Sequence, residues 1–311
     1  MTLNDFRIGW RTLVQEPAYS LVVILGLGVG LAASLLLLGF VHYSWQYNAH
    51  VPDVDNVYVV KHRPNTDPKA PWYDQAPFLL RNAAANAPGV VAATGYLPSR
   101  PNGSDISVKI GGQLWQVTTL TVIPGFEEML GLRAIQGNLQ AALDKPDSLA
   151  ISEAAAVRLF GTSNIIGRAV QVEGRLVRVG AVVGSPPANT TIPFEMLLGV
   201  NSVLMEKGFR EEMLTGAQGW PGKLLVRTHP GASVAAVTAA LQAAVDSAPQ
   251  LQHVPPDVKE RLGKRKIMDI ALSPLREAYF DIEVEGNFIA AAGDRANRVV
   301  IAGLAAIAVL I

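Results

Sequence analysis

The sequence predicts an extracytoplasmic α+β domain, built from two sub-domains and flanked by transmembrane α-helices. Three observations lead to this fold class. An apolar segment without acidic or basic side chains lies near the N-terminus, and a second one ends the sequence. Between them, short alternating runs separated by turn residues extend over residues 44–294. This pattern is typical of mixed strands and helices in a globular domain.

The first apolar segment has the length and composition of a membrane span. No Asp, Glu, Lys or Arg occurs between Glu16 and Asp53. As a helix, residues 21–41 would extend roughly 31 Å, close to the thickness of the hydrocarbon core of a bilayer. A cleaved signal peptide is the alternative, but its apolar region is shorter, and the residues after Val41 make a poor cleavage site. We therefore predict a transmembrane helix over residues 18–43.

The charges beside this segment predict its orientation. Arg7 and Arg11 precede it, whereas the first basic residue after it is Lys61. The positive-inside rule then places the N-terminus in the cytoplasm and the long domain outside. Aromatic side chains flank the segment on both sides, Tyr19 before it and Trp45 after it, as is usual at membrane boundaries.

Residues 1–17 form a predicted amphipathic leader helix on the cytoplasmic side. Leu3, Phe6 and Trp10 recur at helical spacing, and Pro17 ends the pattern. The simpler interpretation is an anchor in the membrane interface. The functional interpretation is a surface that docks a cytoplasmic partner.

Within the predicted span, Gly26, Gly30 and Ser34 are spaced four residues apart and share one helix face. Such a row of small residues lets another membrane helix approach closely, so we predict helix packing there. The glycines do not form a phosphate-binding loop, because no strand precedes them and no Lys-Ser or Lys-Thr follows.

The sequence ends inside a second apolar segment. Residues 299–311 are uninterrupted by charge but would form only about 20 Å of helix, too short to cross a bilayer. We therefore expect residues 295–311 to be the start of a truncated second transmembrane helix.

Turn and cap signals divide the domain between the spans into elements. Gly111-Gly112 and Glu173-Gly174 predict two hairpins, over residues 107–118 and 169–183. Ser152 is a predicted helix N-cap, with Gly161 ending that helix. Further strands are expected over residues 57–61, 149–151, 223–227 and 267–272, and further helices over residues 75–87 and 233–246.

No catalytic, metal or cofactor site is predicted. The chain has no cysteine, and its five histidines are scattered without metal-binding spacing. Ser152 and Ser185 lack the context of a nucleophile. The acidic pair Glu127-Glu128 and the basic cluster at residues 264–266 are best interpreted as solvated surface. With 26 basic and 26 acidic residues, no net field favours nucleic acid.

Several segments, in order, resemble the MacB/FtsX-type ABC transporter permeases, with a MacB-like periplasmic core domain. They cover nearly the whole chain: Asp5-Phe6-Arg7-Ile8, Leu25-Gly26-Leu27-Gly28-Val29-Gly30, Ala150-Ile151-Ser152-Glu153, Arg158-Leu159-Phe160-Gly161, Ile166-Gly167-Arg168, Ser185-Pro186-Pro187 and Pro274-Leu275-Arg276-Glu277.

The resemblance implies a permease subunit in a bacterial inner membrane that transmits ATP-driven motion to its periplasmic domain, for efflux or mechanotransmission. Its implied partners are a cytoplasmic ABC ATPase, a second permease subunit in a homo- or heterodimer, the lipid bilayer and a periplasmic adaptor. Phe6, Arg7, Trp10 and Arg11 would then lie near the ATPase. No Gly-x-x-x-x-Gly-Lys-Ser/Thr loop is present, so ATP would be used by the partner and not by this chain.

Two other functions are compatible with the residues alone. A membrane-tethered binding or sensing domain would use the span only as an anchor. A tethered enzyme would need convergent polar groups in a pocket, and the sequence does not indicate any.

Overall fold

The structure is a computed structural model that describes residues 14–98 and 105–284. The chain divides into two compact units after Gln46. In the first unit, the described element is helix α2 (Pro17–Trp45), which begins with a proline in its first turn. Residues 1–13 of the predicted leader helix, which include Phe6, Arg7, Trp10 and Arg11, and the second apolar segment lie outside the described residues.

Helix α2 has the features of a membrane span. It is 29 residues long and contains no Asp, Glu, Lys or Arg. Almost all of its large apolar side chains are exposed, which is unfavourable in water but favourable in lipid. Among the described helices it alone is long and apolar enough to cross a bilayer.

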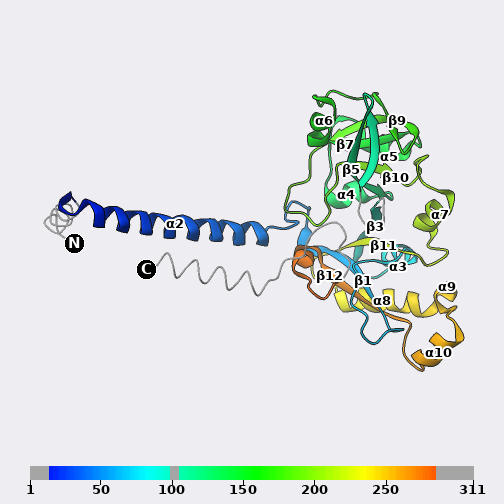
Figure 1. The fold of residues 1–311 in the computed structure, drawn as a ribbon. Helices are drawn as coiled ribbons and strands as arrows, with labels where there is room; N and C mark the ends of the chain where they lie inside the picture. Colours follow the sequence, from blue (N-terminus) through cyan, green and yellow to red (C-terminus); the bar gives the residue numbers. More distant parts are fainter. Residues whose placement is uncertain (1–13, 99–104, 285–311) are drawn as a thin grey trace. The chain divides into compact units, whose positions relative to one another are not determined.

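The second unit contains a mixed α+β domain, as predicted (Figure 1). Its described strands form one sheet in the order β10-β7-β9-β8-β4-β5-β3-β11-β1-β12, with β2 and β6 paired at its side. The strands are β1 (Val57–Pro64), β2 (Ala76–Pro77), β3 (Val90–Pro98), β4 (Asp105–Ile110), β5 (Gln113–Val122), β6 (Ala134–Gly137), β7 (Ser148–Ser152), β8 (Ala169–Val172), β9 (Arg175–Val183), β10 (Met196–Gly199), β11 (Pro221–Thr228) and β12 (Met268–Pro274). The helices are η1 (Val54–Asn56), α3 (Leu79–Ala85), α4 (Phe126–Leu130), α5 (Leu139–Asp144), α6 (Glu153–Phe160), α7 (Lys207–Thr215), α8 (Val234–Ser247), α9 (Pro249–Gln252), α10 (Pro256–Leu262) and η2 (Leu275–Phe280).

Strand β10 closes one half of the sheet into a ring. It pairs with β7 and also, in parallel, with β5, so that β10-β7-β9-β8-β4-β5 return to their start. The interior of this ring lobe is filled by β-branched and aliphatic side chains, and α6 covers it with Ala155, Ala156 and Leu159. Closure leaves none of these ring strands as a free sheet edge.

The other half of the sheet forms a second lobe. Strands β3, β11, β1 and β12 continue outward from β5, and α3 and α8 pack on this part of the sheet (Figure 1). Helix α8 contributes Val237, Leu241 and Val245, at helical spacing, to the core of this lobe. A third cluster, which includes Leu120 of β5 and Phe126 of α4, joins residues of both lobes.

Local chemistry explains the elements that the sequence predicted. Glu173 and Gly174 both have positive φ, +47° and +82°, as a tight two-residue hairpin turn requires. Ser152 accepts a hydrogen bond from the amide of Ala155 at the start of α6. Gly161, with φ +74°, ends that helix, and the predicted caps are confirmed.

The helix predicted over residues 75–87 is shorter in the structure. It begins at Leu79, and Ala76–Pro77 instead form β2 against Pro221 and Gly222 of β11. The cause is Pro77, because a proline disfavours helical geometry at the residue before it.

Candidate functional site

The predicted packing residues of the membrane helix share one face of α2. The Ser34 hydroxyl donates to the carbonyl of Gly30 at 2.8 Å, so its polar group is satisfied within the helix. Apart from neighbouring residues and the backbone of the helix itself, no described atom lies within 4 Å of a Cβ placed on Gly26 or Gly30. The space beside the two glycines is therefore open, whereas Ser34 is buried, and packing of this face against another helix stays a prediction.

The first turn of the domain is held by a fully buried asparagine. Asn48 donates from Nδ2 to the carbonyl of Leu275 at 2.8 Å and to Oγ1 of Thr191 at 2.9 Å. Its Oδ1 accepts from the amide of Thr191 at 2.8 Å and from the hydroxyl of Thr190 at 3.2 Å. We call these four residues the Asn48 clasp. The clasp joins three segments that are far apart in sequence, the beginning of the domain, the loop before β10 and the start of η2.

The backbone of Asn48 explains why asparagine suits this position. Its φ is +59°, in the left-handed region that most residues avoid and asparagine tolerates. Its amide also donates to the carbonyl of Asn189 at 2.9 Å. The side chain and the backbone thus fix the same turn.

A second set of contacts holds the end of the domain. Lys61 of β1 forms an ion pair with Asp281 at 2.8 Å, and both side chains are almost buried. The Ser273 hydroxyl donates to the same carboxylate at 2.8 Å. We call Lys61, Ser273 and Asp281 the Asp281 lock. Just before it, Tyr279 stacks on Tyr47 with ring centroids 3.6 Å apart, which ties the end of the domain to its beginning.

A small cavity of about 30 Å³ lies between the clasp and the lock. Thr191 and Leu275 of the clasp and Lys61 and Asp281 of the lock all line it. Its volume is enough for about two water molecules. Asp74, which belongs to neither group, also lines it.

Beside this cavity is a buried ion pair. Nζ of Lys223 contacts Oδ2 of Asp74, and the side chains are 3% and 17% exposed. Burial lowers the pKa of the Lys223 ammonium, while the charge of Asp74 opposes this change. Burial also raises the pKa of Tyr96. Oδ1 of Asp74 is buried without a hydrogen-bond partner among the described residues, a costly arrangement inside a protein.

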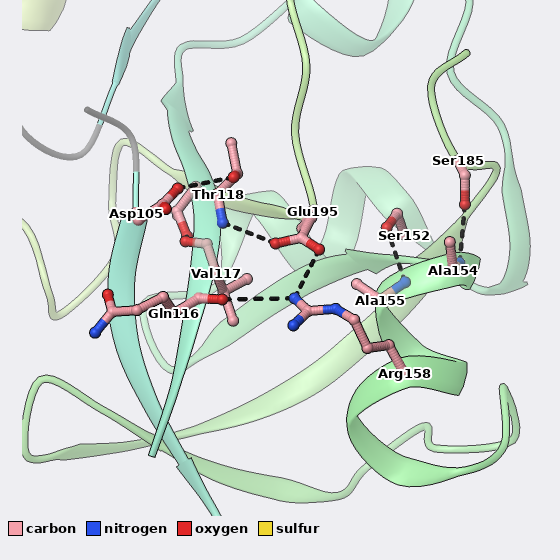
Figure 2. A network of polar contacts seen from close by, with 11 residues as sticks. Asp105, Gln116, Val117, Thr118, Ser152, Ala154, Ala155, Arg158, Ser185 and Glu195 are labelled. Carbon is pink, nitrogen blue, oxygen red and sulfur yellow. Dashed lines mark hydrogen bonds and ion pairs between the residues drawn. The ribbon is translucent and has the colours of Figure 1, made fainter. Parts of the chain in front are cut away.

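The segment of the ring lobe that carries the predicted motif around Ser152 contains an exposed polar network (Figure 2). Arg158 of α6 forms an ion pair with Glu195 at 2.6 Å, and the other carboxylate oxygen of Glu195 accepts from the amide of Thr118 at 3.0 Å. The network thus joins α6, β5 and the segment leading into β10. Since both charged side chains are partly exposed, we expect it to contribute only about 1 kcal/mol to stability.

The serines of this region have structural roles. Ser152 and Ser185 accept hydrogen bonds from the amides of Ala155 and Ala154, respectively (Figure 2). Both hydroxyls therefore satisfy the free amides at the start of α6. In the described parts of the chain, no group of His, Asp and Glu side chains is arranged to hold a metal ion.

The sequence did not indicate the clasp, the lock or the buried pair. Asn48, Asp281 and Lys223 belong to no motif, and each bonds to a residue distant along the chain. The only local indication was for the turn at Asn48, because asparagine tolerates positive φ and this one closely follows a predicted membrane span.

Comparisons with known proteins found one matching family and similar solved structures. The sequence profile of the family described as MacB-like periplasmic core domain matches residues 20–244. A domain of a putative permease protein from Porphyromonas gingivalis is 22% identical, with a TM-score of 0.56 over 72% of this chain and 91% of that one.

Two more distant structures are also similar. The periplasmic region of MacB from Actinobacillus actinomycetemcomitans is 14% identical, with a TM-score of 0.44 over 71% of this chain and 90% of that one. The extracellular domain of the noncanonic ABC-type transporter YknZ from Gram-positive bacteria is 13% identical, with a TM-score of 0.43 over 69% and 99%. No curated protein sequence matches the chain.

The family profile covers well over half of the chain, including most of α2, the ring lobe, and the second lobe as far as residue 244. The Porphyromonas gingivalis domain independently supports the fold. The predicted resemblance is thus confirmed: this chain belongs to the family with a MacB-like periplasmic core domain, the membrane-anchored periplasmic domain of ABC-transporter permeases.

Proposed function

We propose that the chain is the permease subunit of a MacB/FtsX-type ABC transporter and that it transmits ATP-driven motion from a cytoplasmic ATPase to its periplasmic domain. In this proposal α2 spans the inner membrane with the N-terminus in the cytoplasm. Two permease subunits form a dimer, and a periplasmic adaptor can receive the motion. The chain itself has no catalytic role.

The observation that supports this proposal is the firm attachment of both ends of the domain. Asn48 follows the last residue of α2 by three positions and is completely buried. Asp281, near the other end, is held by Lys61 and Ser273. A displacement that reaches the chain at residue 46 therefore enters a packed core. A flexible linker at this point would absorb the displacement instead. Such a linker would be expected in a domain that the membrane helix only anchors.

The cytoplasmic side of the proposal concerns the leader helix. Phe6, Arg7, Trp10 and Arg11 would contact the ATPase, and Gly26, Gly30 and Ser34 would pack membrane helices that move against each other. If so, replacing Arg7 and Arg11 with glutamate should abolish co-purification of the full-length permease with its ATPase. Lys264→Glu changes a charge on the exposed surface of the periplasmic domain and should have no effect.

The packing face has its own test. Gly30→Ile adds a bulky side chain where we expect another helix, so transport or subunit assembly should be impaired while the periplasmic domain stays folded. Unchanged transport would count against packing at this face.

The transmission of motion is tested by making the attachment flexible. These 311 residues contain no cysteine, so Leu176→Cys, at a side chain that is 64% exposed, places one spin label in this part of each subunit. In the full-length dimer with its ATPase, the distance between the two labels should change when a non-hydrolysable ATP analogue is added.

Inserting Gly-Ser-Gly-Ser after Gln46 should abolish this distance change without preventing ATPase binding. The same insertion between Gly111 and Gly112, in an exposed hairpin turn, is the matched control and should keep it. If the parent shows no nucleotide-dependent change, or if the insertion after Gln46 preserves the change, the proposal is wrong. A chain that never binds an ATPase would instead be a tethered binding or sensing domain.

A further inference from the structure

A basic hollow lies on the ring lobe and is lined by no residue of the clasp or the lock. It has a volume of about 460 Å³ and lies between Arg175, at the start of β9, and the loop that leads into α7. Its charged lining is Arg175, Glu206, Lys207 and Arg210, and its apolar lining is residues 203–205. Small-molecule sites commonly have volumes of about 300–1,000 Å³ and combine apolar walls with a few polar groups.

The two arginines are held in place by the same loop. Arg175 donates from Nη1 to the carbonyl of Val203 at 2.7 Å. Arg210 donates from Nη2 to the carbonyl of Ser202 at 3.2 Å. The loop is anchored in turn, because the amide of Val203 donates to the carbonyl of Pro146 at 2.8 Å. A guanidinium fixed in this way keeps further N–H donors for a ligand and loses little entropy when it binds one.

The positive charge of the hollow is not neutralised within the described chain. Three basic side chains line it against one acidic side chain. Among the described residues, no ion pair involves Arg175, Lys207 or Arg210, whereas other basic residues such as Lys61, Arg158 and Lys223 are paired. Lys207 and Arg175 are exposed to solvent. Clustered cations of this kind attract an anion.

We propose that the basic hollow binds an anionic amphiphile, a molecule with a phosphate or carboxylate group joined to an apolar group. The anion contacts Arg175, Lys207 and Arg210, and the apolar group packs on Val203, Leu204 and Met205. Arg–phosphate and Arg–carboxylate contacts are frequently bidentate, which favours these two anions. A free solute and a lipid headgroup both have this chemistry.

The test uses the full chain in nanodiscs of neutral lipid, with 1-naphthyl phosphate as a water-soluble probe and calorimetry as the measurement. The parent should bind one probe per chain. The variant with Arg175→Gln and Lys207→Gln should bind at least tenfold more weakly. Both positions are exposed, whereas Arg210 is half-buried and is kept because it bonds two carbonyls of the loop, those of Ser202 and Met205. A matched control, Lys259→Gln with Lys264→Gln, removes two exposed charges elsewhere and should bind like the parent.

Two further probes test each half of the ligand. Inorganic phosphate and 1-naphthalenemethanol, which lack the apolar group and the charge respectively, should each bind at least tenfold more weakly than 1-naphthyl phosphate. No binding by the parent, unchanged binding by the double variant, or equal binding of inorganic phosphate would overturn the proposal.

Nanodiscs with added anionic lipid identify the source of the ligand. Weakened probe binding in them would assign the hollow to a lipid headgroup, and unchanged binding to a free solute. The variant with Arg175→Gln and Lys207→Gln should keep the ATP-dependent distance change between spin labels. A failure of the ligand-binding proposal is therefore distinguishable from a failure of the proposed permease function.

Discussion

Replacing Asn48 with alanine should strongly destabilise the periplasmic domain, because this side chain connects three distant segments. The change removes both bonds donated by Nδ2 and those accepted by Oδ1. It leaves the carbonyl of Leu275 and the amide of Thr191 in a buried region without their partner. It also places alanine at a φ of +59°.

The expected loss follows from these three changes. A buried polar group that loses its hydrogen bond costs about 1–3 kcal/mol, and a left-handed backbone at alanine costs about 1 kcal/mol or more. With two such groups left unpaired, the free energy of unfolding should fall by about 3–7 kcal/mol, a large part of the roughly 5–15 kcal/mol that stabilises a typical domain.

The assay is urea unfolding of the full chain in detergent micelles, followed by tryptophan fluorescence. Asn86→Ala is the matched control. Asn86 is an exposed asparagine with one local hydrogen bond, to the carbonyl of Asn82, and its replacement should change stability by less than about 0.5 kcal/mol. If Asn48→Ala stays within about 1 kcal/mol of the parent, the clasp does not hold these segments together, and the argument for firm attachment fails with it.

Three more predictions concern the same domain. Lys223→Met leaves the Asp74 carboxylate buried and unpaired, so urea unfolding should show a loss of about 3–5 kcal/mol, and adding Asp74→Leu should recover most of it. Burial lowers the pKa of His62 below its ordinary 6.5, although contacts with Gln75 and Asp74 oppose this shift. The neutral ring therefore contributes stability that is present above pH 6.5 and lost as the pH falls through the lowered pKa. Unfolding free energies at pH 7.5 and 5 should consequently differ less in His62→Gln than in the parent. Gln242→Ala exposes backbone groups of the edge strand β12 and should cause concentration-dependent association in sedimentation, whereas Gln250→Ala should not. A Gln242 variant that sediments like the parent would contradict this role.

The sequence predicted elements whose cause is local. The hairpin at Glu173-Gly174 and the helix between Ser152 and Gly161 depend on turn and cap chemistry within a few residues, and the structure has both. The apolar segment was equally clear, because length and composition alone define it. The predicted start of α3 was wrong by several residues, because Pro77 disfavours helical geometry at Ala76.

Features that depend on distant pairing could not be predicted in this way. Ring closure requires β10 to pair with β5, from Met196 to Thr119, and no local pattern specifies a partner so far away. The same holds for the site, since Asn48 bonds across 143 and 227 positions of sequence. The predicted site residues of the leader and of α2 were inferred from spacing and from family resemblance, and their roles stay predictions.

The edges of the sheet affect how easily the domain can be deformed. Ring closure removes the edges of β10 and β5, and β12 remains at an edge. There Gln242 of α8 accepts from the amide of Ile270 at 2.9 Å and donates to the carbonyl of Met268 at 3.0 Å. One side chain thus occupies the backbone groups that a further strand would use. A domain with closed or covered edges and a packed core resists internal deformation. A displacement entering through the Asn48 clasp would then move the domain as a rigid body, and the spin-label distance between subunits should change far more than distances within one domain.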